Sequence, residues 1–443
     1  MNTPIYDFVQ NYIKSNTARL HMPGHKGVSF LGCEQFDITE IRGADELYAP
    51  NGIIRESEEN ATHLFGTAKT VYSAGGSSQS INAMLYLAYL QADKSSRPFV
   101  LAGRNAHKSF VYALAKLDAG VEWLYPEKSD SLCSCIVTAE SLEKKLNSLE
   151  NKPFAVYITS PDYLGGMSDI KSISWVCKKH DIPLLVDNAH GSYLKFCEKD
   201  IHPITLGADM CCDSAHKTLP VLTGGGYLHV AKNDKYNFSQ NIVNAMAIFG
   251  STSPSYLIMQ SLDLCNKYID KKINEDLILC TQKCDEIKAV MNEICIPNLS
   301  KEPLKITADF RGTDIDFECT FRANGIEFEY ADDDFAVFMF TPQNSPGAYE
   351  KLKKTFKNLD VQHTKEIENV DFEIAERVMT IREAIFSESE EIAVKKALGR
   401  ICASPTVSCP PAIPIAVSGE RITKKHIEIF KKYNIDKILV VKK

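Results

Sequence analysis

The chain has 443 residues, a formal net charge of −7, 44% hydrophobic residues and 24% charged residues. This composition is close to the globular average, which argues against disorder and against a fibrous protein, and the length predicts roughly two to four domains. The basic residues are dispersed, so we expect no nucleic-acid partner. The sequence has no run of about 18 apolar residues and no signal-peptide profile at its start, so we expect a cytoplasmic protein without a membrane partner.

The predicted elements begin with an irregular N-terminal arm, residues 1–55, which is rich in glycine, proline and charge. From residue 56 to 265, near-continuous apolar strands alternate with helical stretches. This pattern predicts an α/β domain with a mainly parallel sheet, whose ligands gather beyond the carboxyl ends of the strands. The expected strands are 99–103, 155–160, 182–187 and 208–214, and the expected helices are 80–92, 109–119 and 172–181.

Residues 266–365 are expected to contain a linking helix pair and then a small α+β unit, because helical periodicity gives way to three short strands and a helix. Residues 366–443 are predicted to form a C-terminal segment with helices and a rigid proline-rich turn. The 14 cysteines lack the paired spacings of zinc sites or disulfide frameworks. Cys280 and Cys284 are one helical turn apart, but no second ligand pair is nearby, so we predict no metal site.

The stretch "YSAGGSSQS" carries the first chemical pattern. It places Gly75, Gly76, Ser77 and Ser78 at the start of a helix. Unpaired backbone amides, hydroxyl groups and the positive end of the helix together form a site for an anion such as phosphate. The alternative is an ordinary loop in which a serine caps the helix.

Further polar residues follow other strands of the same domain. Asp187 ends a buried strand, where a carboxylate needs a cationic or hydrogen-bonding partner. In "CCDSAHKTLPVLTGGGY", Ser214, His216 and Lys217 follow the next strand, and an enclosed lysine amine becomes nucleophilic or forms Schiff bases. His107 follows another strand, ahead of a helix. Each has a simple structural alternative: a satisfied carboxylate, a capping serine, a solvated lysine, or a histidine packed on its own helix.

Together these groups match the requirements of pyridoxal phosphate. This cofactor needs a phosphate cup, a lysine for its aldehyde, an acid that keeps the pyridine nitrogen protonated, and a flat side chain that stacks on its ring. The residues therefore predict a pyridoxal phosphate site at the edge of the sheet.

The sequence also resembles the bacterial ornithine, lysine and arginine decarboxylases, in their short form without an N-terminal wing domain. The resemblance implies a type I PLP-dependent transferase fold with a smaller α+β C-terminal domain. It also implies decarboxylation of arginine, lysine or ornithine to agmatine or a diamine, as in polyamine biosynthesis. Two alternatives stay open: other chemistry on the same cofactor, such as an aminotransferase, and a homologue that binds the cofactor without turnover. The motifs are "LHMPGHKG", "ITEIRGADEL", "RNAHKS", "VDNAHGSY", "DSAHKTLP", "STSPSYLIMQSLD" and "CPPAIPIAVSGE".

The resemblance assigns roles to individual residues. It implies that Lys217 binds the cofactor aldehyde, that Asp187 pairs with the pyridine nitrogen and that His107 stacks on the ring. Ala189 and His190 are expected beside or under the ring, and His190 could assist Lys217 in proton transfer. The expected phosphate-binding residues are Gly76, Ser77, Ser78, Ser214 and His216.

A homodimer with shared active sites is also implied. Ser251 and Thr252 would approach the phosphate or substrate from the partner subunit, although helix capping explains them equally well. For the distal cationic group of the substrate, we expect Asp45 and Glu46 to provide the acidic partner, with the run 332–334 as the alternative.

The chain departs from the family pattern at three positions. Gly76 replaces a hydroxyl of the phosphate turn, and because its backbone amide remains, we expect weaker phosphate binding rather than none. Ala412 and Ser418 replace residues of the C-terminal motif, which affects the local turn and any contribution to substrate choice.

Overall fold

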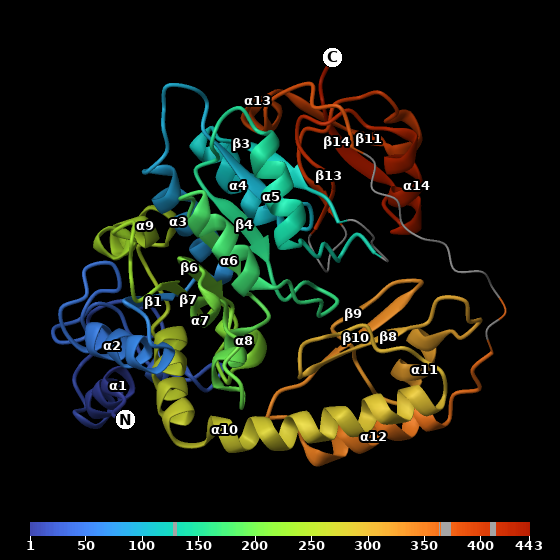
Figure 1. Cartoon of the computed structure of the whole chain (residues 1–443). Coiled ribbons are helices and arrows are strands. Elements are labelled where there is room, and N and C mark those ends of the chain that lie inside the picture. Colours follow the sequence, from blue (N-terminus) through green and yellow to red (C-terminus); the bar gives the residue numbers. More distant parts are fainter. Residues whose placement is uncertain (127–130, 363, 365–373, 408–412) are drawn as a thin grey trace. The chain divides into compact units, whose positions relative to one another are not determined.

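The computed structural model describes residues 1–126, 131–362, 364, 374–407 and 413–443. It forms two compact units, one made of Met1–Gln91 and Ile170–Leu277, the other of Ala92–Asp169 and Ile278–Lys443. Each unit therefore combines segments that are far apart in the sequence. Figure 1 labels the helices and strands along the chain. The boundaries that we expect near residues 55, 265 and 365 stay predictions.

The first unit contains the strand order β1-β7-β6-β5. The β5–β6 pair is parallel, whereas β7 runs antiparallel to β6 and to β1. These strands are buried along almost their whole length, which explains why they appear in the sequence as continuous apolar runs. The elements are α1 (Pro4–Lys14), α2 (Ile53–Phe65), β1 (Lys69–Ser73), α3 (Gly76–Tyr89), α6 (Ile170–Lys179), β5 (Leu184–Asp187), α7 (Pro203–Leu206), β6 (Met210–Asp213), α8 (Ala215–Thr218), β7 (Gly226–Val230), α9 (Ile242–Phe249) and the first part of α10 (Tyr256–Glu293).

The second unit contains the strand order β4-β2-β3, in which the pairs are parallel, and an antiparallel sheet of order β8-β10-β9. The mainly parallel sheet and the small α+β region that the sequence predicts are thus confirmed. The elements are β2 (Phe99–Gly103), α4 (Lys108–Leu117), β3 (Gly120–Leu124), α5 (Ala139–Ser148), β4 (Val156–Thr159), β8 (Lys305–Asp309), α11 (Phe317–Ala323), β9 (Tyr330–Ala331), β10 (Phe335–Met339), α12 (Pro346–Lys357), α13 (Ile381–Phe386), β11 (Ser389–Ala393), β12 (Thr406–Val407), β13 (Pro414–Ala416), α14 (Lys424–Lys432) and β14 (Lys437–Val441).

Helix α10 corrects one sequence expectation, because the predicted helix pair is a single helix of 38 residues. The segment contains neither proline nor glycine, so nothing in it stops the helix. Its buried apolar residues recur every three or four positions, as one face of a continuous helix requires. They include Met259, Leu262, Ile269, Ile273, Leu277, Cys280, Cys284, Ile287 and Met291. None of the described helices is both long and apolar enough to cross a membrane.

Two terminal regions are more regular than the sequence suggests. The expected irregular arm begins with a helix, α1, in which proline occupies the first turn. The expected rigid proline-rich turn is in part a strand, β13, paired with β12. Both differences arise because tertiary packing supplies partners that a local pattern does not reveal: Ile415 and Ala416 of β13, for example, belong to a buried cluster with Phe430 of α14.

Buried ionisable groups occur in both units. In the first unit, Glu58 of α2 accepts a hydrogen bond from the Tyr72 amide at 2.8 Å, and burial raises the pKa of Glu58 to about 8. In the second unit, fully buried Lys305 lies 3.5 Å from the Glu302 carboxylate and 3.4 Å from the Asp162 carbonyl oxygen. Burial raises the pKa of the Asp162 carboxyl to about 6. These groups carry the pH dependence discussed below.

Candidate active site

Several predicted site residues of the first unit lie at one edge of its strands. Asp187, the last residue of β5, is opposite Cys212 of β6, and Asp213 is opposite Tyr227 of β7. Strand β1, antiparallel to β7, ends opposite Gly226. The carboxyl ends of β1, β5 and β6 therefore meet at this edge, which is where ligands of such sheets bind.

The three glycines after Lys217 bring the chain close to the start of α3. The Gly76 amide donates a hydrogen bond to the Gly224 carbonyl oxygen at 2.7 Å. A Cβ atom on Gly226 would lie only 2.7 Å from the carbonyl oxygen of Asp213 and 3.4 Å from the carbonyl carbon of Gly76. Gly76 itself has a φ of 64°, a conformation that favours glycine. The glycines thus allow a contact that any side chain would obstruct.

The start of α3 carries the groups expected to bind phosphate. Ser77 is half-buried and Ser78 is exposed. His216 Cε1 lies 3.7 Å from the position of a Cβ on Gly76, and His216 Nδ1 donates to the Gly225 carbonyl oxygen at 2.9 Å. Ser214 is the N-cap residue of α8, but its side chain makes no capping hydrogen bond. The Gly76 amide is engaged by the Gly224 carbonyl oxygen, and its expected contribution to phosphate binding stays a prediction.

The structure brings Lys217 and His190 together. Lys217 lies in α8, and its Nζ is 2.9 Å from His190 Nε2. His190, which follows β5, is only 5% exposed. At this distance one nitrogen donates a proton to the other, so the pair can hold a proton in either of two positions.

Asp187, the last residue of β5 and three residues before His190, provides a buried carboxylate. It is 2% exposed, and its Oδ1 accepts hydrogen bonds from the Ala189 amide at 3.2 Å and the Cys212 thiol at 3.6 Å. A cationic ligand group would further stabilise the charge of this buried carboxylate. The donor set fits pyridoxal phosphate, because it combines a buried carboxylate, an amine paired with an imidazole, and a 14-residue helix that starts with hydroxyls.

His107 lies in the second unit, at the N-cap of α4. Its Nδ1 accepts a hydrogen bond from the Ser109 amide at 3.1 Å, so the imidazole caps its own helix. This capping contact involves Nδ1 and does not test what lies against the face of the ring, so the stacking role of His107 stays a prediction.

Arg104, from the same motif as His107, has a structural role within the second unit. It is 5% exposed and donates to the carbonyl oxygens of Pro414 at 2.7 Å and Ile415 at 3.1 Å. It also faces the Glu420 carboxylate at 3.5 Å. Two family motifs thus meet here through hydrogen bonds. Ser418, two residues before Glu420, is buried, and Ala412 lies outside the described residues.

Asp45 binds the backbone of its own loop. Its Oδ1 accepts from the amides of Glu46 and Asn51, both at 2.9 Å. Its Oδ2 accepts from the amides of Gly52 at 2.8 Å, Ile54 at 2.9 Å and Arg55 at 3.3 Å. The carboxylate therefore caps helix α2, and this geometry favours a structural role over recognition of a substrate cation. The neighbouring side chain of Glu46 is exposed.

The other candidates show mostly local contacts. Asp332 accepts hydrogen bonds from the Tyr330 hydroxyl at 2.5 Å and the Phe335 amide at 2.8 Å, which fixes the turn between β9 and β10. Ser251 and Thr252 are exposed, and Ser251 Oγ accepts from the Ser253 amide at 3.1 Å. Their predicted contact with a partner subunit remains a prediction.

Sequence reasoning missed a buried network around Asp213. His202 and His229 both lie within hydrogen-bonding distance of its Oδ2, and Asn188 donates to its Oδ1. Asp213 stands inside the quoted "DSAHK" motif, but no local pattern singles out the two histidines, which come from separate segments. His202, Cys211 and Asp213 offer ligand atoms within 4.8 Å of one another. The Cys211 thiol donates a hydrogen bond to Asp213 Oδ1 at 3.6 Å, and burial raises the pKa of this thiol well above its usual value.

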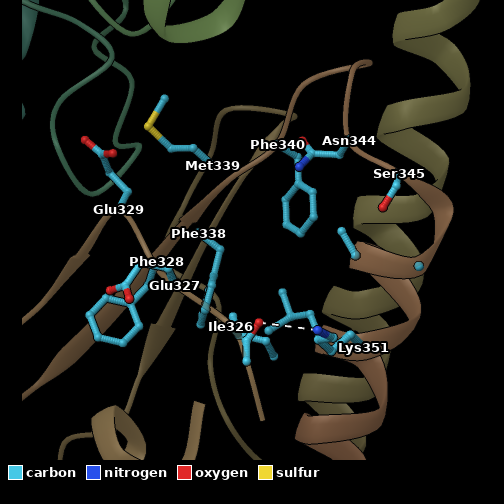
Figure 2. A pocket seen from close by; sticks show the side chains of 14 residues that line it. Ile326, Glu327, Phe328, Glu329, Phe338, Met339, Phe340, Asn344, Ser345 and Lys351 are labelled. Carbon is cyan, nitrogen blue, oxygen red and sulfur yellow. Dashed lines mark hydrogen bonds between the residues drawn. The ribbon is translucent and has the colours of Figure 1, made fainter. Parts of the chain in front are cut away.

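A cavity of about 630 Å³ lies elsewhere, in the second unit (Figure 2). Strand β10 contributes Phe338 and Met339 to it, and α12 contributes Lys351, which donates to the Gly325 carbonyl oxygen at 3.4 Å. None of the predicted site residues lines this cavity, so it is separate from the candidate active site.

Comparison with solved structures defines the class of fold. The chain is similar to the constitutive lysine decarboxylase of Escherichia coli, with a TM-score of 0.77 and 18% identity over all of this chain and 82% of the other. It is also similar to a Francisella novicida lysine decarboxylase, with a TM-score of 0.78 and 15% identity over 99% of this chain and 81% of that one. A structure titled "SPT with PLP" matches with a TM-score of 0.54 and 14% identity, over 68% of this chain and 75% of that chain. The fold is thus that of PLP-dependent decarboxylases and transferases, as the sequence predicts.

Sequence comparison defines the family. The model of the Orn/Lys/Arg decarboxylase major domain matches residues 3–308, and that of the C-terminal domain matches residues 363–434. An arginine decarboxylase of Bacillus subtilis is 29% identical, covering 98% of this chain and 94% of the relative. An arginine decarboxylase of Halalkalibacterium halodurans is 28% identical, covering 98% and 93%. The chain belongs to the Orn/Lys/Arg decarboxylase family, and it is a decarboxylase of a basic amino acid.

Proposed function

We propose that this enzyme decarboxylates arginine to agmatine, with pyridoxal phosphate held at the strand edge of the first unit. The observation that carries the cofactor assignment is the 2.9 Å contact between Lys217 and His190, at the edge where Asp187 ends β5. Arginine is supported by the relatives named arginine decarboxylase, which align over nearly the whole chain.

Each residue has a defined task in this proposal. Lys217 would bind the cofactor aldehyde, and Asp187 would hold the ring nitrogen in its protonated form. Bound pyridoxal phosphate supplies a conjugated ring that takes up the electrons of the broken bond. His190 accepts a proton from Lys217, which leaves the amine neutral and nucleophilic, and returns it when the amine is released. The phosphate would be bound by Ser77, Ser78, Ser214 and His216.

We also propose a homodimer in which each subunit completes the site of the other through Ser251 and Thr252. Both residues are exposed. The arm that carries the "HMPGHKG" motif also exposes large apolar side chains, which a partner subunit would cover. They are Leu20 at 94% exposure, Met22 at 66%, Val28 at 60%, Phe30 at 81% and Leu31 at 88%. The cytoplasmic location, a place in polyamine biosynthesis and the four-segment domain division stay predictions.

The test of the activity uses purified protein, added pyridoxal phosphate and release of carbon dioxide from arginine, lysine and ornithine. We expect visible absorbance, faster release from arginine than from the other two, and neither signal in Lys217→Ala. Faster release from lysine or ornithine would refute the substrate assignment alone. A colourless protein without release from any substrate would refute the whole proposal, and formation of a 2-oxo acid with 2-oxoglutarate would indicate an aminotransferase.

The shared site is tested by mixing two inactive variants, Lys217→Ala and Thr252→Trp. If subunits exchange and Thr252 acts across the interface, hybrid dimers contain one intact site, and a 1:1 mixture should recover about a quarter of the parent activity. Failure to recover activity, with sedimentation showing exchanged dimers, would refute the contribution in trans.

A further inference from the structure

Asp213 is the centre of a fully buried polar network in the first unit. Its Oδ1 accepts hydrogen bonds from Asn188 Nδ2 at 2.7 Å and from the Cys211 thiol at 3.6 Å. Its Oδ2 accepts from His202 Nε2 at 3.1 Å and His229 Nε2 at 3.2 Å. Asp213 and both histidines have no exposed surface. Four donors thus converge on one carboxylate in the interior.

The proton positions in this network follow from the outer contacts of the two histidines. His202 Nδ1 accepts the amide of Ile204 at 3.3 Å, so the proton of this ring lies on Nε2 and points to Asp213. His229 Nδ1 lies 2.9 Å from the Thr70 hydroxyl, and burial lowers the pKa of His229, which keeps its ring neutral. Two neutral rings donate to Asp213, which therefore keeps its full negative charge. Burial opposes that charge, and the four hydrogen bonds that Asp213 accepts stabilise it.

The network joins the two segments that carry the cofactor-binding residues. Asn188 directly follows Asp187, and besides its side-chain bond to Asp213 its amide donates to the Cys212 carbonyl oxygen at 3.0 Å. Asp213 directly precedes the turn that leads to Lys217. The Asn188–Asp213 bond therefore ties the ends of β5 and β6 together just beyond their last paired residues.

We propose that Asp213 is a positioning residue for the proposed reaction. Through Asn188 it fixes Asp187 and Lys217 relative to each other, and it places a second buried negative charge behind the cofactor site. This inference rests on the proposed function. It assigns two separable effects: the Asn188 bond controls how well the site is shaped for pyridoxal phosphate, and the Asp213 charge favours protonation of groups bound at Lys217.

The test compares Asp213→Asn and Asn188→Ala with a matched control, Asp263→Asn. Asp263 is also fully buried in the first unit and accepts hydrogen bonds from the Ser57 hydroxyl at 2.5 Å and the Tyr6 amide at 3.0 Å, but it belongs to α10. Each variant is titrated with pyridoxal phosphate, and the pH midpoint of the visible absorbance change of the loaded protein is recorded. Thermal unfolding of the same samples reports the loss of stability that any buried carboxylate would cause.

For Asp213→Asn we expect the pH midpoint to fall by roughly 0.5 to 1 unit, because a nearby negative charge is lost. For Asn188→Ala we expect the pH midpoint to remain that of the parent and the dissociation constant of pyridoxal phosphate to rise roughly ten- to a hundredfold. Asp263→Asn should lower stability and leave both quantities at their parent values.

The assignment is overturned if Asp213→Asn binds the cofactor with the affinity and pH midpoint of the parent, or if its changes match those of Asp263→Asn. If Asp213→Asn does not fold, Asn188→Ala decides, and an unchanged affinity in that variant overturns the assignment. A parent protein that takes up no pyridoxal phosphate would refute the proposed function and this inference together. A parent that binds normally while the variants do not differ from it would refute this inference alone.

Discussion

Replacing Asp45 by asparagine should loosen the start of helix α2 rather than weaken substrate binding. Both carboxylate oxygens are engaged by five backbone amides at 2.8–3.3 Å. Burial opposes ionisation, but bonds from the amides of Asn51, Glu46, Gly52 and Arg55 outweigh it and hold the Asp45 pKa below its usual value. The asparagine amide group can accept from only one of the two sets of amides. Loss of one charge-assisted set at a helix cap, partly screened by solvent, amounts to about 2 kcal/mol of local stability.

Hydrogen exchange measured by mass spectrometry tests this value at the site itself. A local loss of about 2 kcal/mol corresponds to roughly 30-fold faster exchange in peptides that cover the start of α2, with little change elsewhere. Glu46→Gln is the control, because this exposed neighbour caps nothing, and its exchange should match the parent. The reasoning would be refuted if Asp45→Asn exchanged like the parent while its KM for arginine rose strongly, since Asp45 would then bind substrate.

Three further predictions concern buried groups and close backbone contacts. Glu58 retains its proton in the folded protein up to about pH 8, whereas its reference pKa is 4.5, so the free energy of unfolding should fall between these values by up to about 5 kcal/mol. Thermal unfolding across this range should show that Glu58→Gln removes this pH dependence and that exposed Glu59→Gln does not. Gly226→Ala should lower the thermal midpoint and the affinity for pyridoxal phosphate, because its Cβ would lie 2.7 Å from a backbone oxygen; we expect a loss of about 1–3 kcal/mol in stability. The control is Gly347→Ala, whose Cβ would lie 3.9 Å from a side chain and which should behave like the parent. Lys305→Met should lower the free energy of unfolding by about 3–5 kcal/mol at pH 8. The loss should be smaller at pH 5, where the buried carboxyl groups around this position can take up protons. An equal loss at both pH values in chemical unfolding would contradict this account.

The strand edge of the first unit could be predicted from the sequence because its signals are local. Apolar runs mark β5 and β6, and the polar residues directly after each run lie at the carboxyl end of the strand. The contact between Lys217 and His190 follows from that arrangement, because each follows one of two neighbouring parallel strands. The meeting of these side chains at one edge of the sheet could therefore be predicted with little knowledge of the packing.

Other features depend on contacts between distant residues, which no local pattern encodes. The roles of His202 and His229 come from their meeting at Asp213, although neither has a distinctive neighbourhood in the sequence. Asp45 looked like a candidate for substrate recognition because it is acidic and belongs to a family motif, yet its partners are amides up to ten residues further along the chain. The sequence predicts a helix pair in this segment, whereas the structure has the single helix α10, because the helix contains no proline or glycine that would break it.

The loop Gly224–Gly226 restricts how this enzyme could diversify. Its backbone lies against the start of α3, and the space around Gly226 has no room for a side chain. A surface made of backbone atoms keeps its chemical groups when the side chains around it are substituted. Under the proposed function, a change in phosphate binding would therefore come from the side chains of Ser77, Ser78, Ser214 and His216 rather than from this backbone.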